Sequence, residues 1–80
     1  MMKTEYKYIY FEVVEEKPKT KVWGCYNKRT KNILAFVKWY PVWRQYCFFS
    51  EQQTVFNTSC LKDVAEFLDQ LNEAQKTKKY

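Results

Sequence analysis

The pattern of apolar residues changes once along this chain, at about residue 57, and the change limits which folds are possible. Before it, short runs rich in aromatic and β-branched residues alternate with polar breaks, as is typical of strands. After it, apolar residues recur at the spacing of one helical face. The chain therefore predicts an α+β fold with a four-stranded antiparallel meander followed by one C-terminal helix.

We expect one domain over residues 1–75 and a basic tail over 76–80, since eighty residues make at most one domain. The predicted elements are strands at about 6–15, 21–27, 33–40 and 43–49, and a helix at about 59–75. Short connections favour antiparallel neighbours. A single helix covers only one face of such a sheet. The other face must then meet water, a ligand or a second copy.

The predicted helix has a clear start and a clear apolar side. Asn57, Thr58 or Ser59 can serve as the N-cap. The expected buried stripe consists of Leu61, Val64, Ala65, Leu68 and Leu71, widened by Cys60 and Phe67. In the second strand, Gly24 is the only glycine of the chain, and an interior glycine marks a bulge or a place where another group comes close.

Aromatic residues make up 20% of the chain, and they allow two interpretations. A short chain needs large side chains to build a core, and each ring buries roughly 150–250 Å². The segment VKWYPVWRQYCFF, residues 37–49, holds six rings, too many for one side of one strand. Some of these rings form the core, and others form a surface on which a flat ligand stacks.

Charge is distributed unevenly along the chain, which has a formal net charge of +5. The stretch from residue 17 to residue 50 has eight cations and no Asp or Glu: Lys17, Lys19, Lys21, Lys28, Arg29, Lys31, Lys38 and Arg44. Such a stretch favours an anionic partner. The alternative is a solvated surface that keeps the protein in solution.

In the third strand, the odd positions from Ile33 to Trp39 are all apolar and are expected to face the core. We expect Phe49 under the helix as well. The register of the second and fourth strands is open, and a slip of one residue reverses their faces. The predicted ligand-binding residues are Lys21, Trp23, Tyr26, Arg29, Lys38, Tyr40, Arg44 and Tyr46.

An open sheet face with rings among cations is suited to single-stranded nucleic acid or a nucleotide. Dimerisation through the same face, giving a homo-oligomer, is the alternative. The sequence argues against an enzyme, because it has no His and no Gly-rich phosphate loop. We expect no metal and no cofactor, since Cys25, Cys47 and Cys60 lack zinc-type spacing.

The sequence has neither a signal peptide nor a stretch of about 20 apolar residues, so a cytoplasmic protein without membrane contact is expected. The run from Trp39 to Phe48, WYPVWRQYCF, followed by Thr54-Val55-Phe56 and Cys60-Leu61, resembles small proteins of phages and bacteria. The likeness covers roughly residues 22 to 72. It implies a phage or mobile-element origin, and with it an anti-defence protein that binds a host defence protein or sequesters a nucleotide signal.

The predicted strand order is also similar to that of coactivator-type and Whirly-type folds that bind single-stranded DNA. This second likeness concerns topology alone, and topology does not establish function.

Overall fold

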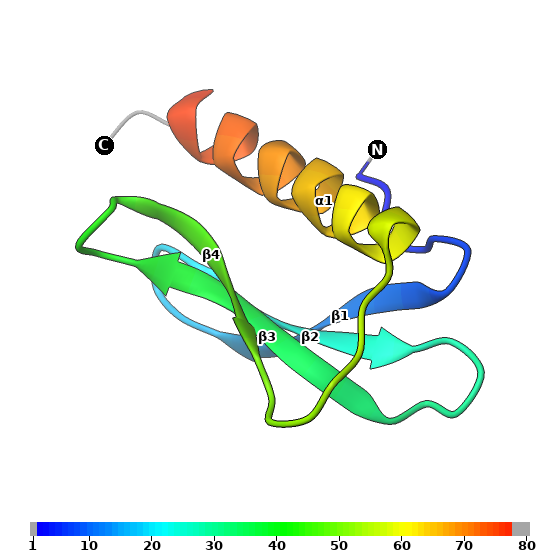
Figure 1. Ribbon diagram of the computed structural model, residues 1–80. Coiled ribbons are helices and arrows are strands. Elements are labelled where there is room, and N and C mark those ends of the chain that lie inside the picture. The colour runs from blue at the N-terminus through cyan, green and yellow to red at the C-terminus, as the bar shows by residue number, and fades with distance from the viewer. Residues whose placement is uncertain (1, 78–80) are drawn as a thin grey trace.

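Four strands and one helix form the fold, in a computed structural model that describes the backbone of residues 2–77 and the side chains of residues 2–76. The elements are β1 (Ile9–Glu16), β2 (Lys21–Asn27), β3 (Ile33–Tyr40), β4 (Gln45–Ser50) and α1 (Thr58–Thr77). The strands lie in the order β1-β2-β3-β4, and every neighbouring pair is antiparallel. Figure 1 shows α1 across one side of this sheet. The predicted α+β meander is confirmed.

The two ends of the fold differ from their predicted bounds. Lys76 and Thr77, placed in a basic tail by the sequence, are the last residues of α1. Residues 78–80 lie outside the described residues. Among the residues that the structure describes, no helix has the length and apolar character that crossing a bilayer requires.

Residues 2–8 precede β1 as an arm that folds back beside it. We expected the first strand to begin at about residue 6, but a turn there joins the Tyr6 amide to the Ile9 carbonyl at 2.9 Å. The Phe11 amide then donates to the Thr4 carbonyl, also at 2.9 Å. The side chain of Gln70 binds both backbone groups of Lys3, at 2.8 and 3.0 Å. The arm is thus held between β1 and α1.

The core lies between the sheet and α1. Its centre is Phe67, fully buried and stacked on Phe11 with ring centroids 3.9 Å apart. The buried residues that form the cluster are Tyr6, Ile9, Phe11, Cys25, Ala35, Val37, Tyr46, Cys60, Val64, Phe67 and Leu71. These residues come from all four strands, the arm and the helix.

The buried stripe of α1 is rotated relative to the prediction. Cys60, Val64, Phe67 and Leu71 are buried, whereas Leu61 is 53% exposed. Both stripes have helical spacing, and the one that buries the large Phe67 ring removes more apolar area from water. Asn57 is the N-cap, because its side-chain oxygen accepts a hydrogen bond from the Cys60 amide at 2.8 Å.

Two irregularities in the sheet change which residues face the core. β1 and β2 shift register between Val13 and Glu15. β2 and β3 shift where Cys25 pairs with Ala35 but Tyr26 pairs with Ile33. Leu34 is the extra residue there, and it packs against the core, while Ile33 is 37% exposed. The expectation that Ile33 faces the core is therefore wrong, because a bulge interrupts the alternation.

Candidate nucleic-acid interface

The side of the sheet opposite α1 carries an aromatic surface, which we call the open face. Its members follow from the cross-strand pairs, since residues directly opposite each other point to the same side. They are Tyr10, Glu12, Glu15, Val22, Gly24, Tyr26, Ile33, Phe36, Lys38, Tyr40, Gln45, Cys47 and Phe49. All five rings of this set are half-buried. The open face is therefore apolar as well as aromatic, without α1 to cover it.

The rings form two groups on the open face. Tyr10 and Tyr26 stack across β1 and β2, with centroids 5.2 Å apart and planes inclined by 16°. Towards the β4 edge of the same face, the Tyr40 ring meets Trp43 edge-to-face at 5.1 Å and Phe49 at 6.0 Å. A flat pair and an edge-to-face cluster thus flank the middle of the sheet.

One lysine lies over a ring of each group. The Lys31 ammonium is 5.1 Å from the Tyr10 centroid, and the Lys38 ammonium is 4.8 Å from the Phe49 centroid. Cation–π contacts of this kind contribute about 0.5–1 kcal/mol at exposed sites. They place positive charge directly above the rings, where it can meet a phosphate.

Negative charge enters the open face from β1. Glu12 lies opposite Gly24, and Glu15 lies opposite Val22. The acid-free stretch of the sequence starts at residue 17 and so does not include this strand. The positive part of the open face is consequently β3 with β4, around Lys38.

The structure divides the predicted ligand residues among three places. Tyr26, Lys38 and Tyr40 lie on the open face, as predicted. Arg29 lies in the β2–β3 turn, where its amide binds the Asn27 side chain at 2.8 Å. Lys21 and Arg44 lie at the opposite end of the sheet, on the side of α1, where each lines a cavity beside Gln75. Placing these two on the open face is therefore wrong.

Placing Trp23 and Tyr46 on the open face is wrong, and so is placing Phe49 under the helix. Trp23 meets Phe67 edge-to-face at 5.1 Å, and Tyr46 is 6% exposed beneath α1. The reason is register, since Trp23 pairs with the buried Val37, Tyr46 pairs with Trp39, and Phe49 pairs with Phe36.

Three rings of the open face, Tyr10, Phe36 and Phe49, were not among the predicted ligand residues, and the sequence held a signal for the last two. Any turn with an even number of residues after Tyr40 puts Tyr46 on the same side as Trp39, which sends Phe49 to the other side with Phe36. Tyr10 shares its parity with Glu12 in the first strand, so its side follows once the register to β2 is known. That register is set by a bulge, which no residue type in this stretch indicates.

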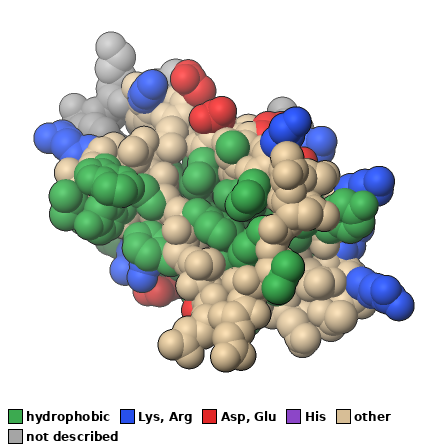
Figure 2. All heavy atoms as spheres, viewed as in Figure 1, with side chains coloured by type: hydrophobic (Ala, Val, Ile, Leu, Met, Phe, Trp, Pro, Cys, Tyr) green, Lys and Arg blue, Asp and Glu red, His purple; other side chains and the backbone are tan. Residues whose placement is uncertain are grey.

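The β3–β4 turn carries an exposed apolar tip. Trp43, predicted to begin the fourth strand, is in this turn and is 64% exposed, and Val42 is 72% exposed. Figure 2 shows apolar side chains gathered at this turn and again between α1 and β4.

Burial disfavours ionisation of two of the three thiols, Cys25 and Cys47. Burial raises the pKa of Cys25 to about 12, with a smaller contribution from nearby Cys60. Burial also raises the pKa of Cys47, which lies on the open face. The described residues contain no group of three or more His, Cys, Asp or Glu side chains placed to hold a metal ion.

Comparisons of the chain with models of protein families, with curated proteins and with solved structures gave no match. The interpretation of the site therefore depends on its own geometry.

Proposed function

We propose that this protein is a non-enzymatic binding module whose open face holds single-stranded nucleic acid. The observation that carries the proposal is the pairing of rings with lysines on an uncovered sheet face, above all Lys38 over Phe49 at 4.8 Å. Bases stack on aromatic side chains at about 1–3 kcal/mol each, and lysines follow the phosphates. Aromatic rings and lysines are thus both present on the open face.

The charges on the open face favour one path for the bound nucleic acid across the sheet. Glu12 and Glu15 repel phosphate at β1, whereas Lys38 attracts it at β3. The bound strand therefore lies over β3 and β4, with Tyr40 and Phe49 as the stacking rings. Tyr10 and Tyr26, which stack on each other, form the border of the site.

The test is the affinity for a fluorescently labelled oligothymidylate, measured by anisotropy at two salt concentrations. Tyr40→Leu should weaken binding about 5- to 100-fold, the range that one lost stacking contact gives. Lys38→Ala should weaken binding and also reduce its salt dependence.

The matched control is Lys62→Ala, which removes the same charge from an exposed position of α1. Equal losses for Lys38→Ala and Lys62→Ala would contradict the proposal, because they would show attraction to net charge alone. Thermal unfolding of each variant separates lost binding from lost folding.

A second candidate function is binding to a protein, such as a host defence protein. The exposed Val42 and Trp43 side chains at the β3–β4 turn favour it, because exposed aromatic residues often anchor protein interfaces. If no oligonucleotide binds at low salt, this candidate takes precedence. Trp43→Ala should then abolish complex formation with the partner while Lys38→Ala leaves it intact.

A further inference from the structure

A cavity lies on the α1 side of the sheet, where the β1–β2 turn, the end of β3 and the C-terminal half of α1 meet. Figure 1 shows the β1–β2 turn and the β3–β4 turn at the same end of the sheet as the last turns of α1. The cavity has a volume of about 520 Å³, which is within the usual size of small-molecule sites. Its lining residues are Lys17, Pro18, Lys19, Thr20, Trp39, Arg44 and Gln75.

The lining of this cavity combines positive charge with one large ring. Lys17, Lys19 and Arg44 contribute three cations, and none of the described residues that line it is acidic. Trp39 is half-buried and is held edge-to-face by Tyr46 at 5.5 Å. Such a lining suits a ligand with a planar body, which packs on the indole, and an anionic group, which meets the cations.

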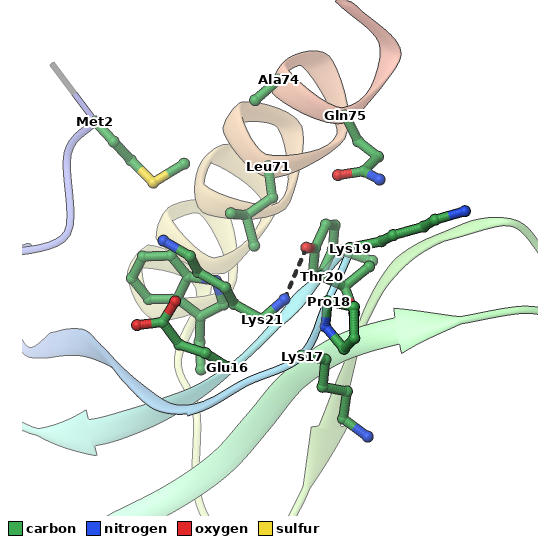
Figure 3. Close-up of a pocket in the computed structure, with 12 residues that line it drawn as sticks. Met2, Glu16, Lys17, Pro18, Lys19, Thr20, Lys21, Leu71, Ala74 and Gln75 are labelled. Carbon is green, nitrogen blue, oxygen red and sulfur yellow. Dashed lines mark hydrogen bonds between the residues drawn. The ribbon is translucent and has the colours of Figure 1, made fainter. Parts of the chain in front are cut away.

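A second cavity, of about 350 Å³, adjoins the first across the β1–β2 turn. Figure 3 looks into it and shows Met2 and Leu71 on its apolar side, while Lys17 and Lys19 extend away from it. Trp23 lines this second cavity, and its indole N–H is buried without a hydrogen-bond partner among the described residues.

Among the described residues, Arg44 is one of three non-glycine positions with positive φ, with Lys31 and Gln53, and the only one of the three that lines this cavity. Arg44 has φ 54°, a left-handed conformation that costs a non-glycine residue roughly 1–2 kcal/mol. Its amide donates to the Tyr40 carbonyl at 2.9 Å, which closes the turn. Glycine would suit this backbone conformation better, which makes Arg44→Gly a substitution that removes the guanidinium without straining the turn.

We propose that this cavity binds a nucleoside phosphate, with the base on Trp39 and the phosphate between Lys17 and Arg44. The site is separate from the open face, because Trp39 and Lys38 point to opposite sides of β3. The ligand can be a free mononucleotide or the 5′-phosphorylated end of a strand, which share this chemistry.

The experiment is a titration by calorimetry with the four ribonucleoside monophosphates, with adenosine and with inorganic phosphate. At least one monophosphate should bind, and adenosine and phosphate should each bind at least 10-fold more weakly. Binding of phosphate alone as tightly as any monophosphate would overturn the proposal, because the ring would then contribute nothing. Absence of binding by all four monophosphates would overturn it as well.

Arg44→Gly is the decisive variant, because glycine suits the φ of 54° and the protein should fold at least as well as before. It should weaken monophosphate binding about 10- to 100-fold, the range for a hydrogen bond to a charged group. Arg44→Lys, which keeps the charge, should lose less. Lys38→Ala is the matched control on the open face and should change nothing, and an equal loss for Lys38→Ala would contradict the proposal.

Oligonucleotides with and without a 5′-phosphate distinguish the two sources of the ligand. A phosphorylated strand that exceeds the monophosphate in affinity, and that loses this advantage in Arg44→Gly, assigns the cavity to a strand end. Equal affinities assign it to the free nucleotide. Unphosphorylated oligonucleotides should respond to Lys38→Ala and not to Arg44→Gly, so either proposal can fail without the other.

Discussion

Gly24 determines where the Tyr26 ring lies on the open face. The Tyr26 ring lies back over Gly24, so a Cβ added there would be 2.8 Å from the Tyr26 Cε2 atom and 2.9 Å from its Oη atom. The same ring stacks on Tyr10 across the strand pair. An interior glycine predicted a close approach, and the approaching group is the ring two residues further along the same strand.

Gly24→Ala should move the Tyr26 ring off its place without unfolding the protein. The atoms that a new Cβ would meet are at the far end of a rotatable side chain, and alanine is favoured over glycine in a strand by about 0.5–1 kcal/mol. We expect the free energy of unfolding to change by less than about 1 kcal/mol, while the tyrosine near-UV circular dichroism decreases. In a Tyr26→Ala background the same change should be neutral or stabilising. A large loss of stability in both backgrounds would show that the backbone is constrained as well.

At the scale of elements, α1 protects the outer edge of β4. The Asn72 side-chain oxygen accepts a hydrogen bond from the Tyr46 amide at 2.7 Å, and its amide nitrogen donates to the Tyr46 carbonyl at 3.5 Å. The helix thus supplies the contacts that a neighbouring strand would make. Exposed strand edges promote pairing between molecules, and a side chain that occupies the edge opposes it.

Asn72→Ala should leave the part-buried Tyr46 amide without a partner. Such a loss costs about 1–3 kcal/mol, which is large for a domain of this size. Asn72→Asp is the control, because it keeps the acceptor at 2.7 Å and loses only the longer contact. Urea unfolding should therefore rank the stabilities as wild type, Asn72→Asp and Asn72→Ala, in decreasing order. Equal stability of Asn72→Ala and wild type would show that water replaces the side chain at this edge.

The elements were more predictable than their faces. β2 and β3 begin and end at the predicted residues, because polar and proline-containing breaks bound them in the sequence. The start of β1 was predicted too early, since the arm turns at Tyr6 to reach Gln70, a contact 64 positions away. The faces of β1 and β2 depend on bulges, which are backbone features with no marker among the side chains here, whereas the face of β4 follows from the even length of the β3–β4 turn. About half of the residues of the candidate site could therefore be assigned to a face only once the strand register was known.

At the scale of the whole molecule, Tyr6 joins the arm, the sheet and the helix. It is 5% exposed, its ring packs edge-to-face on Phe11 at 5.9 Å, and its hydroxyl accepts a hydrogen bond from Gln70 at 3.0 Å. The same hydroxyl donates to the Glu66 carboxylate at 3.5 Å. The Lys28 ammonium donates to the Tyr6 carbonyl at 3.1 Å, which adds the β2–β3 turn. The contacts that join the arm, the sheet and the helix therefore involve the titratable hydroxyl of Tyr6.

The stability of the fold should therefore decrease as the pH rises from about 10 to about 12. Burial, with help from the Glu66 carboxylate, raises the pKa of Tyr6 from 10.0 to about 12. Between these values the unfolded chain has lost the proton that the folded protein keeps, so rising pH favours unfolding. Below pH 10 the hydroxyl is neutral in both states, and its contribution is fully present.

Tyr6→Phe should make the free energy of unfolding less dependent on pH between about 10 and 12, and it should also remove the Gln70 and Glu66 hydrogen bonds at neutral pH. Urea unfolding of both proteins at several pH values measures the difference, which cancels the titration of the other tyrosines and lysines. Parallel pH profiles for the two proteins would show that Tyr6 ionises without opening the contact between the arm and α1.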